Sequence, residues 1–300
     1  MGLSKYASLT DRSVIRLSGA DVHHFLQNLV TSNIDKVDES GAGFAALLTP
    51  QGKILFDFLI IKDGADYLLD TPSATAADLV KRLTFYRLRA KLDITDISAT
   101  HQVIAAWGGE APVAATQTRA ADPRLAALGS RFYGNADEIS SALEASGFAA
   151  ADMDAYRAYR VTQGVPESLS DFDYSSIFPH DADMDQLNGV SFSKGCYVGQ
   201  EVVSRVHHRG TARKRFIQVS GSAPLPSPGA DLEIDGASIG TLASTVDAGD
   251  RFQGIALVRL DKVARGRAEG HQVTCNGAIV ELTIPDWATF DWPASSDDDA

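Results

Sequence analysis

The sequence predicts an α+β protein that ends in a small β-barrel, and two features of its pattern predict this class. Up to residue 215, short apolar strands alternate with helices that carry one apolar face. From Phe216 to Ile284, only short alternating runs occur, separated by turn signals such as Asn276-Gly277. The 300 residues suit about two domains. We therefore expect an α+β region of two subdomains over 1–215, a barrel over 216–285 and an acidic tail over 286–300.

The first part of the chain reads as strands with helices between them. Apolar residues from Val22 to Leu29 follow helical spacing after Asp21, which predicts a helix that begins there. Pro50 and Gly52 stand in turn positions between two apolar strands. These patterns predict strands over 13–17, 43–48, 54–61, 67–70, 91–97 and 102–106, and a second helix over 74–86.

The middle of the chain is less regular. Residues 108–127 are rich in alanine and weakly patterned, which predicts a variable loop or short elements. Helices are expected over 136–145 and 152–163, and Gly164 suits the end of the second one. The stretch 165–188 is polar and aromatic without periodicity, and a loop of this length is usually functional when it is ordered. Beyond it we expect barrel strands over 216–219, 232–234, 238–246, 252–260, 272–275 and 278–284.

The composition excludes several classes of protein. At 44% hydrophobic and 22% charged residues, the chain resembles ordinary soluble globular proteins. It carries no apolar run that could span a bilayer, and its N-terminus lacks the pattern of a signal or transit peptide. Its two cysteines, Cys196 and Cys275, favour a reducing compartment over a disulfide framework. We therefore expect a cytoplasmic protein that does not bind membranes.

The charge is distributed unevenly. The net charge of −12 argues against broad binding to nucleic acid. Basic residues nevertheless gather in two places, 205–215 and 81–91, while the tail holds the acidic run 297–299. Such clusters are commonly solvated faces, but in an acidic protein they also suit a small polyanionic ligand.

The stretch 193–201, which reads SKGCYVGQE, concentrates more special residues than any other. We interpret it as a glycine-rich turn that leads into a helix near Gly199. This places Cys196 just before a helix N-terminus, with Lys194 two residues away. Both features lower the pKa of a thiol, so we expect Cys196 to be exposed and reactive and Cys275 not to be. The alternative is that Cys196 is a small buried hydrophobe, as free cysteines often are.

This stretch resembles the signature of the YgfZ family of folate-binding proteins, which are relatives of the glycine cleavage T-protein (an aminomethyltransferase). The resemblance extends back through 164–167 (GVPE) and 178–181 (FPHD), and forward from Arg205 to Arg215. Weaker similarity runs from about Arg16 to Ile97. The resemblance implies a ring of α+β subdomains around a central folate channel, followed by a C-terminal β-barrel.

The resemblance also implies a function and a set of site residues. YgfZ proteins support iron–sulfur enzymes in a tetrahydrofolate-dependent way, chiefly through assembly or repair of 4Fe–4S clusters. Expected partners are therefore folate and, transiently, iron–sulfur client proteins. The residues expected to carry the chemistry are Cys196, Lys194 and Asp57, and those expected to bind folate or a derivative are Tyr156, Glu167, Tyr197, Gln200, Glu201, Arg205 and Arg209.

Three positions depart from the relatives. Aminomethyltransferases carry two adjacent acids on a strand, and here the matching pair is Phe56-Asp57. Because phenylalanine cannot handle a proton, this departure weighs against aminomethyl transfer. Two tryptophan positions of the folate pocket fall on Tyr156 and Arg12. Tyr156 can still stack on a pterin or can simply be a packed helix residue.

Three functions remain open at this stage. The first is a folate-binding accessory factor for iron–sulfur enzymes with a reactive Cys196. The second is a folate-dependent aminomethyltransferase or demethylase. The third is a folate-binding module in which Cys196 is structural. We expect no resident metal, because two cysteines are too few for a stable cluster and the Cys and His spacing does not fit zinc.

Overall fold

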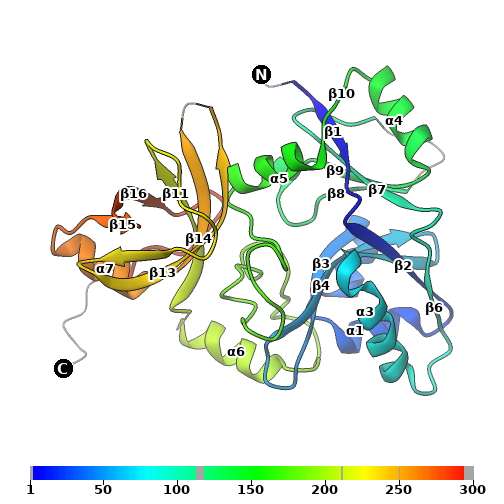
Figure 1. Ribbon diagram of the computed structural model, residues 1–300. Helices are drawn as coiled ribbons and strands as arrows, with labels where there is room; N and C mark the ends of the chain where they lie inside the picture. The colour runs from blue at the N-terminus through cyan, green and yellow to red at the C-terminus, as the bar shows by residue number, and fades with distance from the viewer. Residues whose placement is uncertain (1–2, 113–117, 211, 250, 294–300) are drawn as a thin grey trace. The chain divides into compact units, whose positions relative to one another are not determined.

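The computed structural model describes residues 3–112, 118–210, 212–249 and 251–293 (Figure 1). The acidic run 297–299 and a part of the expected loop at 108–127 lie outside these ranges. The chain forms two compact units. The first unit contains residues 1–156 and 187–202, and the second contains 157–186 and 203–300. Helices α5 (Met153–Thr162) and α6 (Gln200–Arg209) each begin in the first unit and end in the second.

The first unit contains two five-stranded sheets, and one of them carries most of the expected N-terminal elements. Its strand order is β3-β4-β5-β2-β6, and every neighbouring pair is antiparallel. The strands are β2 (Arg12–Ser18), β3 (Ala42–Leu48), β4 (Ile54–Asp63), β5 (Asp66–Pro72) and β6 (Asp93–Asp96). The associated helices are α1 (Val22–Leu29), α2 (Ile34–Ser40) and α3 (Ser73–Arg87).

The second sheet of this unit has the order β10-β1-β7-β9-β8. Its strands are β1 (Lys5–Ser8), β7 (Gln102–Trp107), β8 (Thr118–Ala121), β9 (Ser130–Gly134) and β10 (Ala149–Ala150). Helix α4 (Ala136–Ala145) buries Ile139 and Leu143 in a cluster with Phe132 of β9 and Phe148. Asn135 caps this helix, because its side chain accepts from the N–H groups of residues 137 and 138.

Buried charges join the two sheets. The Asp70 carboxylate on β5 accepts from Arg12 Nε at 2.6 Å and from Arg131 Nη1 of β9 at 2.7 Å. Arg131 also lies 3.4 Å from Asp122, which pairs with Arg124 at 2.8 Å. Burial alone would raise the pKa of Asp122, but the Arg124 guanidinium outweighs it and lowers this pKa to about 2. These charges are costly to bury unless they are paired, and here each one is.

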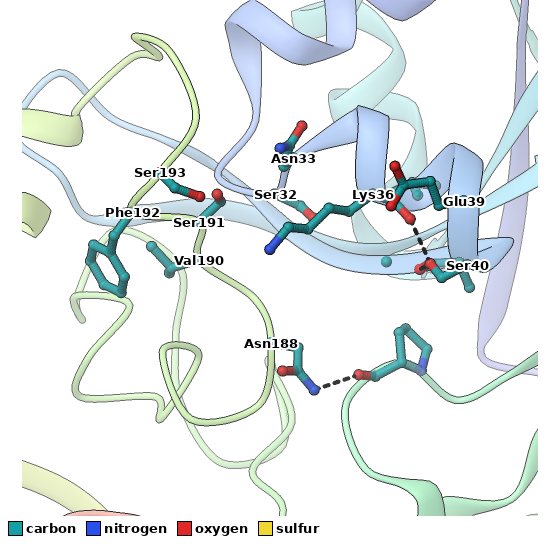
Figure 2. A pocket seen from close by; sticks show the side chains of 14 residues that line it. Ser32, Asn33, Lys36, Glu39, Ser40, Asn188, Val190, Ser191, Phe192 and Ser193 are labelled. Carbon is teal, nitrogen blue, oxygen red and sulfur yellow. Dashed lines mark hydrogen bonds between the residues drawn. The ribbon is translucent and has the colours of Figure 1, made fainter.

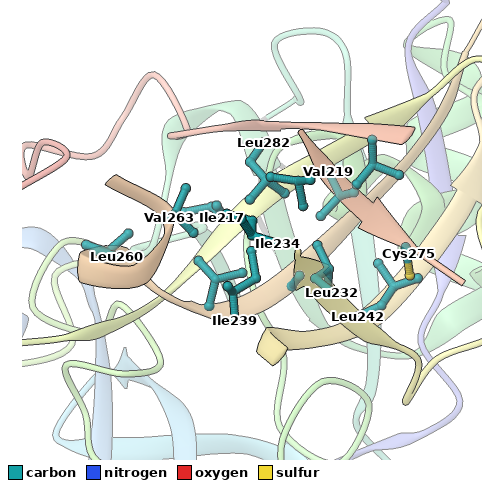
Figure 3. Close-up of a cluster of buried hydrophobic side chains, with 14 residues drawn as sticks. Ile217, Val219, Leu232, Ile234, Ile239, Leu242, Leu260, Val263, Cys275 and Leu282 are labelled. Atoms are coloured by element: carbon teal, nitrogen blue, oxygen red, sulfur yellow. The ribbon is translucent and has the colours of Figure 1, made fainter. Parts of the chain in front are cut away.

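The second unit is built around a closed barrel with the strand order β11-β14-β13-β12-β15-β16. The strands are β11 (Lys214–Gly221), β12 (Asp231–Ile234), β13 (Ala237–Asp247), β14 (Phe252–Arg259), β15 (Val273–Cys275) and β16 (Ala278–Thr283). Helix α7 (Leu260–Ala268) follows β14 directly. Figure 3 shows the barrel core, in which Cys275 packs among aliphatic side chains such as Leu232 and Leu242.

The structure confirms the expected helices and barrel strands within a few residues, and it adds elements that the pattern did not predict. Helices α2 and α7 and strands β1, β9 and β10 were not expected, whereas β8 lies in the stretch 108–127, where a loop or short elements were expected. The unexpected elements are short, and β1 and β10 pair with partners far away in the sequence. The first barrel strand begins at Lys214, close to the expected boundary at 215.

Candidate functional site

The signature stretch is attached to an edge of the first sheet through residues 30–32. Strand β3 is the edge strand, and Val30 forms an isolated antiparallel bridge with its Leu47. The Thr31 N–H donates to Ala46 O at 3.0 Å, and the Ala46 N–H donates to Thr31 Oγ1 at 2.8 Å. The edge is therefore paired rather than open.

Thr31 also holds the segment that leads into the signature. Its Oγ1 donates to Gly189 O at 2.6 Å, and its carbonyl accepts from the Ser191 N–H at 2.9 Å. Thr31 is fully buried, so these hydrogen bonds are protected from water. Residues 189–191 thus lie along the covered edge of β3, immediately before the signature.

Lys194 is the next anchor. Its Nζ donates to Val30 O and Ser32 O, both at 2.7 Å, and lies 5.3 Å from the centre of the Tyr197 ring. Burial lowers the pKa of Lys194 to about 8. The hydrogen bonds of this ammonium within the described ranges go to the segment that covers β3. Its expected influence on the Cys196 thiol stays a prediction.

A close contact between two glycines fixes the other end of the signature. Gly52, in the turn between β3 and β4, and Gly199, before α6, both have a left-handed backbone, with φ of 84° and 81°. A Cβ on Gly199 would lie 2.5 Å from Thr49 O and 3.1 Å from the Cα of Gly52. Only glycine fits this approach, because a side chain would collide with backbone as well as strain φ. Gly195, by contrast, has open space where a Cβ would stand.

The side chain of Gln200 fixes the start of α6. Its Oε1 accepts from the Tyr197 N–H at 3.0 Å, which satisfies one backbone donor ahead of the helix. Tyr197 is 9% exposed, and burial raises the pKa of its phenol to about 12. Glu201, Arg205 and Arg209 are exposed on α6. Two of the residues expected to bind folate, Tyr197 and Gln200, therefore stabilise the loop itself.

The two cysteines differ as expected in exposure. Cys196 is exposed on the signature loop between the Lys194 anchor and the Gly199 contact. Cys275 is fully buried in the barrel core, where burial raises the pKa of its thiol and the carboxylates of Asp231 and Glu233 add to that effect. The structure therefore presents one thiol to solvent and encloses the other.

A cavity of about 610 Å³ borders the signature within the first unit. Figure 2 shows Lys36 extending from α2 over this cavity toward the segment that carries Val190 and Ser191. The Ser191 hydroxyl is buried and has no hydrogen-bond partner among the described residues. Asn188 closes another side through a 3.1 Å hydrogen bond to Pro123 O. The remaining lining residues are Ser32, Asn33, Val37, Glu39, Ser40, Ala42, Gly43, Phe192 and Ser193.

Two further residues expected at the site are buried in the first unit. Asp57 lies on β4 opposite Ala46 and is 9% exposed, and its neighbour Phe56 is 7% exposed. Tyr156 is 2% exposed, with its ring 5.3 Å from that of Trp107 and 5.9 Å from the Arg131 guanidinium. This is the packing expected if Tyr156 is a packed helix residue and not a stacking partner of a pterin. Neither residue lines the cavity beside the signature.

Glu167 belongs instead to a buried ion cluster of the second unit. Arg160 is nearly fully buried and lies 3.4 Å from Glu167 and 2.7 Å from Asp171. The Asp171 carboxylate also accepts from the Glu167 N–H at 2.8 Å and from the Ser244 N–H at 3.1 Å. These bonds tie the GVPE segment to barrel strand β13. Neither Arg160 nor Asp171 was predicted as important, because a buried charge looks like a surface charge in a sequence.

A second such cluster holds the FPHD segment. Arg215 at the start of the barrel donates to His180 O at 2.7 Å and to Asp185, and it lies 3.3 Å from Asp183. Burial lowers the pKa of His180 to about 4, against the influence of the Asp185 carboxylate.

In the described part of the chain, no three His, Cys, Asp or Glu side chains are arranged to hold a metal ion, and no helix could span a membrane.

Comparisons with known proteins bear on this geometry. The GCVT N-terminal domain matches residues 5–139, and the CAF17 C-terminal beta-barrel domain matches residues 213–290. The crystal structure of glycine cleavage system aminomethyltransferase T from Bartonella henselae superposes with a TM-score of 0.77 at 13% identity, over 96% of this chain and 87% of that one. These matches confirm the predicted fold class.

Three curated relatives of this chain share one name. The iron–sulfur cluster assembly factor IBA57, mitochondrial, of Homo sapiens is 32% identical, and that of Mus musculus is 30% identical. Each alignment covers 96% of this chain and 85% of the relative. The homologue from Mycosarcoma maydis is 29% identical over 98% of this chain and 87% of its own. These names replace the more general YgfZ resemblance. They also overturn the expected cytoplasmic location, because the relatives are named as mitochondrial proteins.

Proposed function

The chain belongs to the IBA57 family of iron–sulfur cluster assembly factors, and we propose that it serves the assembly or repair of 4Fe–4S enzymes by presenting the Cys196 thiol to a client protein. The observation that carries this proposal is the exposure of Cys196 on a loop that is anchored on both sides. Thiolates are the usual protein ligands of iron–sulfur clusters.

A single thiol suits the transfer of an iron–sulfur cluster rather than its storage. A stable cluster needs about four protein ligands, and Cys275 is enclosed in the core of the other unit. Cys196 can therefore supply one ligand while a donor or client supplies the others, so that the cluster is cargo. The open space beside Gly195 leaves room for such a partner to approach the loop.

Alkylation and client activation together test this role. Iodoacetamide labelling of the folded protein from pH 5 to 9, read by peptide mass spectrometry, should modify Cys196 long before Cys275. A Cys196→Ser variant should lose the ability to restore activity to an apo 4Fe–4S enzyme, whereas Cys275→Ser, if folded, should retain it. Equal slow labelling of both thiols until denaturation, or full activity of Cys196→Ser, would show that Cys196 is structural.

We further propose that a folate occupies the cavity beside the signature. A volume of about 610 Å³ falls within the range of small-molecule sites. Lys36 is exposed beside it without an ion pair among the described residues, which suits a glutamate carboxylate. The buried Ser191 hydroxyl and the amides of Asn33 and Asn188 offer partners for a polar ring. None of the described residues that line this cavity is among those expected from the sequence to bind folate.

A tetrahydrofolate titration distinguishes the two locations. Saturable quenching of protein fluorescence is expected for the wild type and should weaken in Lys36→Ala, whereas Lys214→Ala, which removes an exposed lysine of the barrel, should leave it unchanged. If Tyr156→Leu abolishes binding and Lys36→Ala does not, the site predicted from the sequence is correct and the cavity is not the folate site. No quenching at millimolar ligand would remove folate from the proposal altogether.

The aminomethyltransferase alternative is not favoured by any contact at the site. The likeness to the aminomethyltransferase structure is one of fold alone. Phe56 fills one position of the acid pair and is itself buried. We therefore expect no folate-dependent release of ammonia from an aminomethyl donor, measured with glycine cleavage partners.

A further inference from the structure

The C-terminal end of α3 exposes two large apolar side chains. Phe85 is 70% exposed and Leu88, the residue after the helix, is 86% exposed. The buried face of the same helix is formed by Ala76, Leu79 and Leu83, so Phe85 and Leu88 are not part of its core contact. Exposed apolar residues that lie together mark interaction sites more often than isolated ones do.

The backbone at Leu88 is unusual for leucine. Its φ is 47° and its ψ is −106°, a conformation that side chains with a Cβ rarely adopt. Holding a residue other than glycine in such a conformation costs on the order of 1–3 kcal/mol. The fold thus bears a local strain and displays a leucine in solvent, where that leucine contributes almost nothing to the core.

A cavity lies beside this leucine. It has a volume of about 460 Å³ and is bounded by α1 on one side and by the end of α3 on the other. The largely buried side chains of Phe25 and Leu29 line it together with Tyr86 and Leu88. Such a cavity can accept an apolar side chain from outside.

Basic residues surround the apolar patch. Arg82, Arg89 and Lys91 are exposed and form no ion pair with any residue that the structure describes, whereas Lys81 pairs with Asp78 at 3.1 Å. The whole chain carries a net charge of −12, so this concentration of unpaired cations is local. A negatively charged partner would be attracted to this end of α3 and repelled by most of the remaining surface.

We propose that Arg82, Phe85, Leu88, Arg89 and Lys91, with the cavity beside them, form a docking surface for an acidic protein segment that inserts an apolar side chain. The unpaired cations attract the segment, and the cavity accepts its anchor. A nucleic acid would satisfy the cations and leave the cavity and both apolar residues without a role. This surface is separate from the signature loop, and the proposal does not depend on the function of Cys196.

Three labelled peptides of about twelve residues test the proposal by fluorescence anisotropy on the full-length protein. The first carries two leucines at helical spacing among glutamates, the second has lysines in place of the glutamates, and the third has serines in place of the leucines. The first should bind at least about tenfold more tightly than the third, since burial of one leucine accounts for such a factor. It should also bind more tightly than the second, because the lysines of that peptide would meet the basic residues with like charge. Its affinity should fall between 0.05 and 0.5 M salt, because salt screens exposed charges.

A matched pair of variants separates docking from folding. Leu88→Gly removes the side chain and relieves the left-handed backbone, so it should bind the first peptide at least about tenfold more weakly without loss of thermal stability. Leu169→Gly is the control, because Leu169 is also an exposed leucine with a positive φ, of 65°, outside the basic cluster. It should bind the peptide as the wild type does.

Three outcomes would overturn the proposal. Equal binding of all three peptides, or equal binding of a single-stranded DNA of the same charge, would show a surface without an apolar anchor. Equal losses in Leu88→Gly and Leu169→Gly would place the peptide elsewhere. A dimer in sedimentation that disappears in Leu88→Gly would make a second copy of this chain the occupant.

Discussion

The signature loop at 193–199 and the long loop at 165–188 both carry dense motifs, but the structure uses them in opposite ways. The signature loop is held by backbone carbonyls and a glycine contact, and its cysteine remains exposed. In the long loop, Glu167, Asp171, Asp183 and Asp185 are engaged with two buried arginines. A motif can therefore present chemistry or hold a scaffold, and the number of special residues does not reveal which.

The largest expected difference concerns the buried charges of the long loop. Asp171→Ala leaves the Arg160 guanidinium, whose side chain is 2% exposed, with Glu167 at 3.4 Å as its remaining acid in the cluster. Loss of one partner of a buried pair typically costs about 3–5 kcal/mol. The free energy of unfolding from urea titration, read by tryptophan fluorescence, should fall by that amount.

The control for this prediction is Glu201→Ala in the signature. Glu201 is exposed in the first turn of α6, so its removal should change the free energy of unfolding by less than about 0.5 kcal/mol. Similar losses in both variants would mean that the two loops do not differ in the way described.

The next effect separates the two glycines of the signature. Gly199→Ala should cost about 2–4 kcal/mol, because alanine strains the left-handed backbone and overpacks the contact with Gly52. Gly195→Ala should be nearly neutral for stability, since its Cβ would meet nothing within 4 Å. Thermal unfolding of both variants measures the contrast, and a neutral Gly199→Ala would show that the glycine contact does not hold the loop.

The variant Lys194→Met tests the other anchor of the signature loop. The variant leaves Val30 O and Ser32 O without their charged donor, so the free energy of unfolding should fall by about 1.5–3 kcal/mol. Lys36→Met, which removes an exposed lysine nearby, should cost far less. The same two variants, alkylated across pH, report whether the Lys194 ammonium also acts on the Cys196 thiol. If the pH midpoint of Cys196 alkylation is unchanged in Lys194→Met, the Lys194 ammonium only anchors the loop.

The last effect is a dependence on pH between about 4 and 6.5 that arises in the long loop. His180 has its pKa lowered to about 4 by burial, from an ordinary value of 6.5, with Asp185, Arg215 and His207 as its charged or titratable neighbours. The folded state then binds fewer protons than the unfolded state between these values. Stability is therefore full above pH 6.5 and declines as the pH falls toward 4.

The slopes of stability against pH in two histidine variants isolate the contribution of His180. The His180→Gln variant should show a shallower loss of stability between pH 6.5 and pH 4, by up to about 3 kcal/mol over the interval. His208→Gln, at an exposed histidine of α6, should keep the wild-type slope. Parallel curves for His180→Gln and the wild type would contradict the assignment.

The sequence predicted the fold wherever a local pattern was long enough. The apolar spacing from Val22 to Leu29 and the barrel strands with their turn signals gave elements close to those observed. The helix α7 was missed because it follows β14 without a break and contains Gly266, which is required by packing: a Cβ there would lie 2.5 Å from the Ile234 side chain. Strand β1 was missed because its partners are β7 and β10, more than 90 residues away.

The site was predicted less completely than the fold. The signature and the exposure of Cys196 followed from neighbouring residues, so sequence reasoning reached them. The cavity depends on α2, the segment at Pro123 and residues 188–193, which only tertiary structure brings together. The buried state of Tyr156 depends on Trp107 and Arg131 in the same way.

The buried charges between the two sheets couple distant parts of the first unit to each other. Any cut between β7 and β8 would place Asp70 on one fragment and Arg131 on the other, each with a charge on a newly exposed face. Such a cut would also divide the second sheet, and the loss of a buried charge partner would destabilise both fragments. The matched GCVT domain at 5–139 contains both Asp70 and Arg131, so this match keeps the two partners of the ion pair together.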